Sequence, residues 1–316
     1  MLRVIFVLLL LADKSNASDW RLIRTSIAEL TQKASLLSVK GNQIEVLRLN
    51  NSPKSKVTHR FYIQAGLHGN EVITTDFALW LAQRLISDQG ALVKLPAGIQ
   101  IDIVPKASPD TFNKSRYNSN GVNLNRNFDV LWGVSQEPTG DTSFSEPESL
   151  AIKDLFQQQN YDSSIDVHGY INWVVLPSPP KTVKESGLKV GNIHTQAYDN
   201  WVRAAKNNLT KLPKEAKYKL KFAGELGDGG AFEDWSFWRQ QTLSLCLELM
   251  NFPNKQDYEA YENFIYQTFI SAIRIKKDLG FPAKTNNSKI TAFSSEPATF
   301  EDKNLATQKP QKILRN

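Results

Sequence analysis

Residues 58–86 read THRFYIQAGLHGNEVITTDFALWLAQRLI, and this stretch decides the fold class. Its first part, residues 58–65, is rich in strand-forming side chains and stops at Gly66. Its last part, residues 71–86, carries apolar side chains at helical spacing. A strand, a glycine-rich turn and an amphipathic helix in this order are the repeating unit of α/β domains. The stretch therefore predicts a layered α/β fold.

The rest of the chain continues this alternation of strand and helix patterns. Residues 242–250 (TLSLCLELM) form the most apolar strand candidate, which predicts a central place in the sheet. Predicted helices lie between the predicted strands, and this alternation favours a largely parallel or mixed sheet. The other predicted strands span residues 99–104, 164–167 and 173–176, and the other predicted helices span residues 146–159 and 258–279.

Both ends of the chain differ from its centre. Arg3, the short apolar run of residues 4–12 and the small residues before Ala17 are typical of a cleaved export signal. The run is too short for a permanent membrane anchor, which needs roughly 20 apolar residues; a buried first strand is the alternative. We expect a signal peptide at residues 1–17, a catalytic domain at 18–281 and a polar, disordered tail at 282–316. Export predicts a periplasmic or secreted protein.

The composition is that of an ordinary globular protein. The 316 residues include 38 Lys or Arg and 32 Asp or Glu, for a net charge of +6. A mean hydropathy of −0.38 excludes a multi-span membrane protein. The excess of basic residues is modest, and we expect it to be distributed along the whole chain, so no nucleic-acid partner is expected. A single cysteine, Cys246, excludes a disulfide framework and a multi-cysteine metal site.

Two histidines and a glutamate have the chemistry of a metal site. His68 and Glu71 flank the turn between a predicted strand and helix, so both side chains can point at one position. His168 ends another predicted strand, and Asp166 lies two residues before it on the same face. Two His and one Glu with an open fourth position are typical of catalytic zinc. A glycine-rich turn with a helix-initiating glutamate and an ordinary strand-end histidine are the alternatives.

Residues that could assist a metal lie in two other segments. The loop 115–128 (SRYNSNGVNLNRNF) contains Arg116, which could stabilise an oxyanion, and Asn125 with Arg126, which could hold a carboxylate. Glu248 lies inside the apolar strand 242–250, where burial would suit a general base. A solvated polar loop and a water-facing glutamate are the alternatives.

Four motifs together resemble the zinc carboxypeptidases. They are H-x-x-E at His68, N-R-N-F at residues 125–128, D-x-H at Asp166, and D-W at residues 234–235 followed by Glu248. The resemblance spans roughly residues 55–280 and implies a three-layer α/β/α sandwich with a central mixed sheet. It implies one zinc ion per chain, and the following roles: ligands His68, Glu71 and His168; electrophile Arg116; terminal-carboxylate clamp Asn125 and Arg126; water-activating Glu248; and Tyr170 along the substrate cleft.

Two departures from the family pattern affect these expectations. Well-known members carry an aspartate where this chain has Asn123, whose amide can accept from the first zinc histidine but adds no charge. The glycine-rich stretch 223–233 fits a moving lid but lacks the family's capping tyrosine. It is acidic instead, through Glu225, Asp228 and Glu233, which puts specificity for large apolar terminal residues in doubt.

These features predict an exported zinc carboxypeptidase that removes C-terminal residues from peptides. An acidic pocket beside an arginine clamp would suit diaminopimelate, lysine or arginine at the terminus, so peptidoglycan stem peptides are the expected substrate. An amide deacylase of the aspartoacylase type shares some motifs, but it adds a β-rich C-terminal domain where this chain has a long helix. A non-catalytic peptide-binding module on the same fold is the third possibility.

Overall fold

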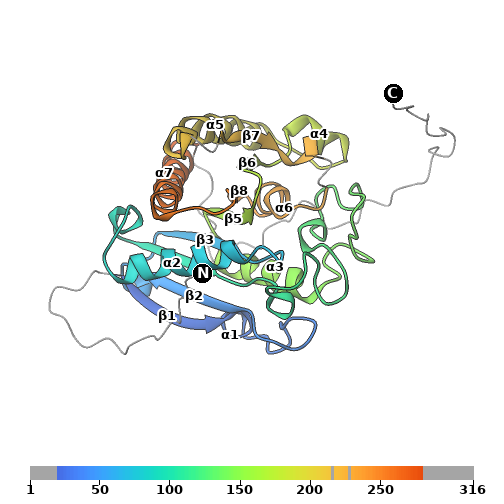
Figure 1. Cartoon of the computed structure of the whole chain (residues 1–316). Helices are drawn as coiled ribbons and strands as arrows, with labels where there is room; N and C mark the ends of the chain where they lie inside the picture. Colours follow the sequence, from blue (N-terminus) through green and yellow to red (C-terminus); the bar gives the residue numbers. More distant parts are fainter. Residues whose placement is uncertain (1–19, 215–216, 227–228, 280–316) are drawn as a thin grey trace, which may run out of the picture.

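Eight strands form one sheet in the computed structural model, which describes residues 20–214, 217–226 and 229–279. The sheet runs from β1 at the bottom of Figure 1 to β7 at the top. In spatial order the strands are β1 (Arg21–Ser26), β2 (Glu45–Asn50), β4 (Ile99–Val104), β3 (His59–Ala65), β5 (Ser163–Gly169), β8 (Leu243–Leu249), β6 (Trp173–Leu176) and β7 (Lys219–Phe222).

The centre of the sheet is parallel and its flanks are partly antiparallel. Strands β4, β3, β5 and β8 run in the same direction, whereas β1 and β2 pair in antiparallel fashion at one side. β6 returns antiparallel to β8 and pairs in parallel with β7. The sheet is therefore mixed, as predicted, and every residue of β4 is buried, as expected for a strand covered on both faces.

Helices cover both faces of the sheet, and two neighbouring residues of β3 show how. The Phe61 ring stacks on Phe269 of α7 (Lys255–Leu279), while the Tyr62 ring packs against Phe156 of α3 (Pro147–Gln159). Because successive strand residues point to opposite faces, α7 and α3 lie on opposite sides of the sheet. α2 (Val72–Ile86) joins α7 through Phe77, and α6 (Phe232–Trp238) joins α3 through aromatic contacts. This is the expected three-layer sandwich.

The remaining elements are shorter or peripheral. α5 (Asn192–Asn208) packs along α7, and its Trp201 indole donates to the Ser244 carbonyl of β8. The other helices are α1 (Ile27–Thr31) and α4 (Pro180–Glu185). The 3-10 turns are η1 (Lys54–Lys56), η2 (Leu92–Lys94), η3 (Pro109–Thr111), η4 (Leu124–Arg126), η5 (Leu209–Lys211) and η7 (Ala223–Leu226).

Each strand and helix predicted above is present, with ends shifted by up to three residues. The sequence patterns did not predict β1, β2, β7, α1, α4, α5 and α6. α6 is missed because all seven of its residues are buried, so it has no polar face to give a helical period. The predicted signal peptide and the predicted tail lie outside the described residues.

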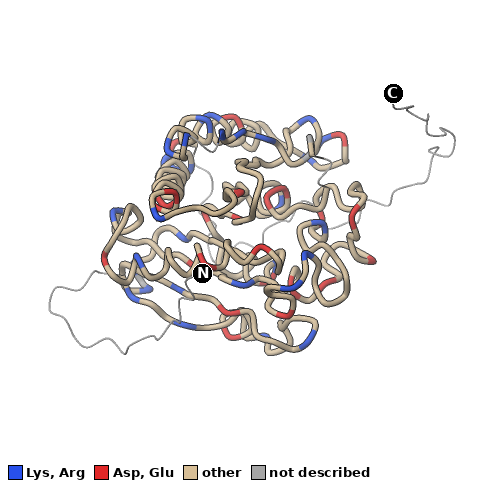
Figure 2. The backbone as a smooth tube through the Cα atoms, in the orientation of Figure 1, with Lys and Arg blue, Asp and Glu red and all other residues tan. Residues whose placement is uncertain are grey.

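The basic excess is concentrated in one part of the molecule, so the expectation that it is spread along the chain was wrong. Residues 181–221 contain ten Lys or Arg and three Asp or Glu, and the rest of the chain is close to neutral. Figure 2 shows the corresponding blue segments around α5 and β7. Among the described residues, no helix is both long enough and apolar enough to cross a membrane.

Asp162 ties the start of β5 to its neighbours on both sides. Its carboxylate accepts from the Arg60 backbone N–H at 2.9 Å and from Lys276 Nζ of α7 at 2.8 Å, and it lies 3.3 Å from His59 Nδ1. Burial alone would raise the pKa of Asp162, but His59 and Lys276 outweigh it and lower the pKa to about 2. The ionised form therefore stabilises the fold.

Asp162→Asn should reduce the free energy of unfolding by about 2 kcal/mol at neutral pH, the value that the lowered pKa implies. Because the folded-state pKa is lowered, this stabilisation is present above pH ~4 and is lost as the pH falls toward 2. Urea unfolding at several pH values measures it. Asp199→Asn, at an exposed position of α5, is the control. A stability difference that persists unchanged at pH 2 would contradict this account.

Candidate metal centre and active site

The candidate site lies where three parallel strands end together. β3, β5 and β8 are neighbours, so their carboxyl ends meet at one edge of the sheet. His68 and Glu71 follow β3, His168 is near the end of β5, and Glu248 is near the end of β8. His168 and Glu248 are register partners, so their side chains leave the same face of the sheet side by side. Open α/β sheets bind ligands at this edge.

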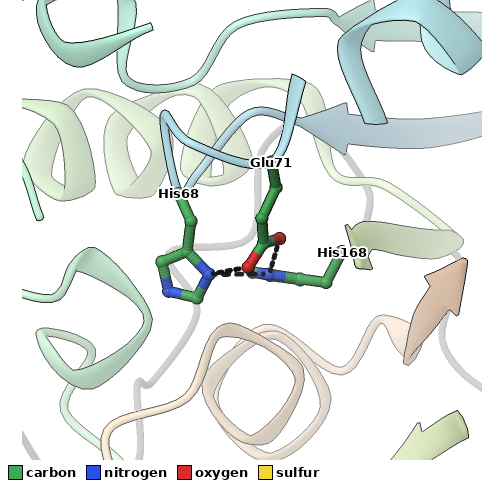
Figure 3. Close-up of side chains that lie close together, drawn as sticks. All are labelled: His68, Glu71 and His168. Atoms are coloured by element: carbon green, nitrogen blue, oxygen red, sulfur yellow. Dashed lines mark hydrogen bonds and ion pairs between the residues drawn. The ribbon is translucent and has the colours of Figure 1, made fainter. Parts of the chain in front are cut away.

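His68, Glu71 and His168 converge on one point (Figure 3). His68 Nδ1 lies 2.9 Å from Glu71 Oε1 and 3.1 Å from His168 Nδ1, and His168 Nδ1 lies 3.1 Å from Glu71 Oε2. All three side chains are buried. Ligand atoms about 2.1 Å from a tetrahedral zinc ion are separated by roughly 3.4 Å, so the observed spacing fits such an ion.

In both histidines the hydrogen bond of Nε2 determines the protonation of Nδ1, the nitrogen that faces the other ligands. His68 Nε2–H donates to Asn123 Oδ1 and His168 Nε2–H donates to Asp166 Oδ2, both at 2.9 Å. Each imidazole therefore turns the lone pair of Nδ1 toward the other and toward the Glu71 carboxylate. Three electron-pair donors that face one another repel, and a cation bound between them removes this repulsion. The donor set, two imidazoles and one carboxylate, is suited to zinc with one position left for water or substrate.

The turn that carries His68 is held by the loop that follows β4. Gly69 lies so close to the Thr111 carbonyl that a Cβ at this position would collide with it, which explains the glycine. The Asn113 N–H donates to the Gly69 carbonyl at 2.7 Å, and the Asn70 N–H donates to the Ser115 carbonyl at 2.9 Å. The second bond places Arg116 beside the metal ligands, although it lies 48 residues from His68.

Arg116 points at the centre. Its Nη1 lies 3.2 Å from His68 Nδ1 and 3.5 Å from Glu71 Oε1. Nε and Nη2 on its other edge donate to the two oxygens of Glu137, at 3.0 and 3.2 Å. A cation fixed in this way can stabilise negative charge that develops next to the metal position.

The segment with the predicted carboxylate clamp packs against the start of α6. Asn125 Oδ1 accepts from the Phe232 N–H at 2.8 Å, and the Phe128 N–H donates to the Gly230 carbonyl at 3.0 Å. A Cβ at Gly230 would collide with the Arg126 carbonyl. Gly230 therefore serves a close backbone contact between this segment and the start of α6.

Arg126 is less open than a free clamp would be. Its side chain is only 8% exposed, with Nη1 donating to the Asn125 carbonyl and Nε to Ser135 Oγ. Nη2 donates to Glu137 Oε1 at 3.1 Å. The Glu137 side chain is 30% exposed and is therefore more accessible to solvent than the guanidinium it binds.

Glu248 has the environment of a general base. It is largely buried, and its Oε2 has no hydrogen-bond partner among the described residues. Burial raises the pKa of Glu248 to about 7. A carboxylate with this pKa can accept and return a proton near neutral pH.

Tyr170, two residues after His168, is partly exposed. Its hydroxyl oxygen lies 3.4 Å from the Asn70 carbonyl oxygen.

Of the three acidic residues in the stretch 223–233, the structure describes the side chain of one, Glu233. Glu233 of α6 is buried, and its Oε2 has no hydrogen-bond partner among residues 20–214, 217–226 and 229–279. Burial, with the charges of Asp234 and Asp166, raises the pKa of Glu233 well above its ordinary value. The side chain of Glu225 and residue Asp228 lie outside what the structure describes.

The sequence interpretation missed Glu137. It lies in an irregular loop, 21 residues after Arg116 and 11 after Arg126, and no motif or period links these positions. Only the folded chain brings its carboxylate between the two arginines. The one available signal was an acidic residue that follows two arginines in the same irregular segment.

His168→Ala should abolish the binding of one zinc ion per chain, because it removes one of three converging donors. Elemental analysis of the purified protein after dialysis measures the occupancy. His194→Ala in α5, away from the site, is the matched control and should keep full occupancy. Full zinc occupancy in the His168 variant would show that the ligand set is wrong.

Comparison with known proteins agrees with this geometry. The chain is 24% identical to carboxypeptidase M of Mus musculus over 254 residues, which cover 72% of this chain and 56% of that protein. It is 28% identical to carboxypeptidase D of Anas platyrhynchos, covering 71% of this chain and 18% of that one. The chain thus spans about half, or less, of the length of these relatives.

Solved structures show the same fold. Carboxypeptidase A from Helicoverpa armigera superposes with a TM-score of 0.57 at 19% identity, covering 83% of this chain and 69% of that one. A metallo-carboxypeptidase from Burkholderia cenocepacia superposes with a TM-score of 0.56 at 19% identity, and the match covers 80% of this chain and 65% of that one. The model of the zinc carboxypeptidase family matches residues 18–274. The chain belongs to the zinc carboxypeptidase family.

Proposed function

We propose that the protein is a metallocarboxypeptidase that removes single residues from the C-terminus of peptides. The observation that carries this proposal is the meeting of the His68, Glu71 and His168 donors with Glu248 and Arg116 at one edge of the sheet. A zinc ion held by the three donors would polarise the scissile carbonyl and acidify a water.

Glu248 and Arg116 would divide the proton and charge chemistry between them. Glu248, with its raised pKa and an oxygen free of partners among the described residues, would take the proton of the attacking water and return it to the leaving amine. Arg116 Nη1, beside His68 and Glu71, would stabilise the negative charge that develops on the carbonyl oxygen.

Asn125 and Arg126 would recognise the free terminal carboxylate. Arg126 is held by neighbouring oxygens, and Asn125 is fixed through its Oδ1 to the Phe232 N–H, so both are preorganised. Guanidinium and amide donors favour a carboxylate over a neutral amide. Peptides with an amidated C-terminus should therefore be poor substrates.

Glu233 supports a preference for a cationic terminal side chain. The Glu233 carboxyl group is buried, and one of its oxygens has no hydrogen-bond partner among the described residues, which lowers the stability of the protein. A substrate ammonium or guanidinium group that bound this oxygen would remove that cost. Lysine, arginine and diaminopimelate carry such a group. With the export signal expected at residues 1–17, diaminopimelate-containing peptidoglycan peptides in the periplasm or outside the cell are the substrate we propose.

Glu248→Gln should lower kcat by on the order of 10²–10⁴-fold without loss of zinc, because the amide keeps the shape but cannot accept a proton. The kcat/KM of the wild type should fall as the pH decreases, since protonated Glu248 is inactive. A bound cation lowers its pKa, so the midpoint is expected below pH 7. Near-normal turnover by the zinc-loaded variant would remove Glu248 from the mechanism.

Glu233→Gln should reduce the preference for lysine-ended over phenylalanine-ended peptides by about tenfold, as expected for loss of a buried charge pair. The readout is the ratio of kcat/KM values for the two peptides, with amidated versions of both as negative controls. Glu185→Gln, at an exposed position of α4, is the matched control. A wild type that prefers phenylalanine-ended peptides would contradict the cell-wall substrate and leave the zinc chemistry unaffected.

A further inference from the structure

The carboxylate of Glu137 joins three functional parts of the site. Oε2 accepts from Arg116 Nε at 3.0 Å and from Asn123 Nδ2 at 2.8 Å, and Oε1 accepts from Arg116 Nη2 at 3.2 Å and from Arg126 Nη2 at 3.1 Å. These are four charge-assisted or polar bonds from three residues to one side chain. Charge-assisted and bidentate bonds of this kind fix a carboxylate in place, although the side chain is 30% exposed.

The first branch leads to the metal ligand His68. The Asn123 amide accepts from His68 Nε2–H through Oδ1 and donates to Glu137 through Nδ2. An amide polarised by a carboxylate on its N–H side is a stronger acceptor on its oxygen side. The negative charge of Glu137 thus reaches the imidazole through Asn123. This supplies the charge that Asn123 itself lacks, contrary to the sequence expectation that His68 has only a neutral partner.

The second branch orients Arg116. Glu137 binds the Nε–Nη2 edge of the guanidinium side-on with both oxygens, and a planar guanidinium held at one edge cannot rotate. The edge that remains carries Nη1, which is the atom beside His68 and Glu71. Glu137 therefore determines where the charge of Arg116 points.

We propose that Glu137 is a positioning residue that sets both the zinc affinity of His68, through Asn123, and the direction of Arg116. It contacts neither the metal ligands nor the position of the reacting atoms. The Arg116 branch rests on the function proposed above, whereas the His68 branch requires only that the site binds zinc.

Partial burial raises the pKa of Glu137, but its bonds from Arg116 and Asn123 outweigh it and lower the pKa to about 2. Its charge is therefore present throughout the pH range in which a peptidase assay is run.

Glu137→Gln in the full-length protein tests both branches. We expect the zinc dissociation constant, measured by competition with a chromogenic chelator, to rise about tenfold, as for other groups behind a metal ligand. We also expect kcat on a free-acid peptide to fall at least tenfold with a smaller change in KM. The zinc measurement does not depend on activity, so it separates failure of this inference from failure of the proposed function. Glu185→Gln is again the control.

The double variant Glu137→Gln with Asn123→Asp separates the two branches. A carboxylate at position 123 would face His68 directly, so zinc affinity should return to within about twofold of the wild type. Arg116 would still lack its side-on partner, so kcat should stay low. A purely structural role of Glu137 predicts no such selective recovery. If Glu137→Gln does not fold, Glu137→Asp, which keeps the charge but shortens the side chain, should show the same loss of kcat in milder form.

Two results would overturn the inference. An unchanged zinc dissociation constant in Glu137→Gln would remove the His68 branch. A lower KM for free-acid peptides with unchanged kcat would show that Glu137 merely occupies the arginine clamp and competes with the substrate carboxylate.

Discussion

Three electron-pair donors that face one another inside a protein repel unless a cation lies between them, and this constraint organises the molecule. Nδ1 of His68, Nδ1 of His168 and the Glu71 carboxylate lie about 3 Å apart because the ends of β3 and β5 hold them there. Asp166 fixes the ring of His168 directly, whereas Glu137 acts one residue further out, where it fixes the charge of Arg116. The sheet, the turn after β3 and the loop that follows β4 can be understood as the frame for this one arrangement.

The charges of the site form a continuous network rather than isolated pairs. Asp166 bonds His168, His168 and His68 face Glu71, and His68 connects through Asn123 to Glu137. Glu137 then pairs with Arg116 and Arg126. In a buried environment, where the effective dielectric is low, each member influences the others more strongly than in water. The carboxylates therefore have different properties: the pKa of Glu137 is lowered, while those of Glu248 and Glu233 are raised.

The sequence contains the parts of this structure that depend on local chemistry. The strand Ile99–Val104 and the helix Val72–Ile86 follow from period and apolar content, and H-x-x-E at His68 follows from the turn between such elements. α6 could not be predicted, because a helix buried on all sides has no polar face. Glu137 could not be predicted either, because its partners lie 11 to 21 residues away across irregular loops whose path depends on the whole fold. The packing of Gly230 against the Arg126 carbonyl is equally non-local, and a glycine-rich stretch alone suggests motion instead.

The separation of the metal ligands along the chain has a thermodynamic consequence. Glu71 and His168 are 97 residues apart, so an ion bound to both closes a loop that covers α2, β4, α3 and most of β5. Closing a long loop removes conformational entropy from the unfolded chain, as a disulfide does, although a metal contact is reversible. Binding to the folded state alone also stabilises it in proportion to the logarithm of the free ion concentration. In a chain whose single cysteine rules out an internal disulfide, the zinc ion would be the cross-link that joins the first half of the sheet to the second.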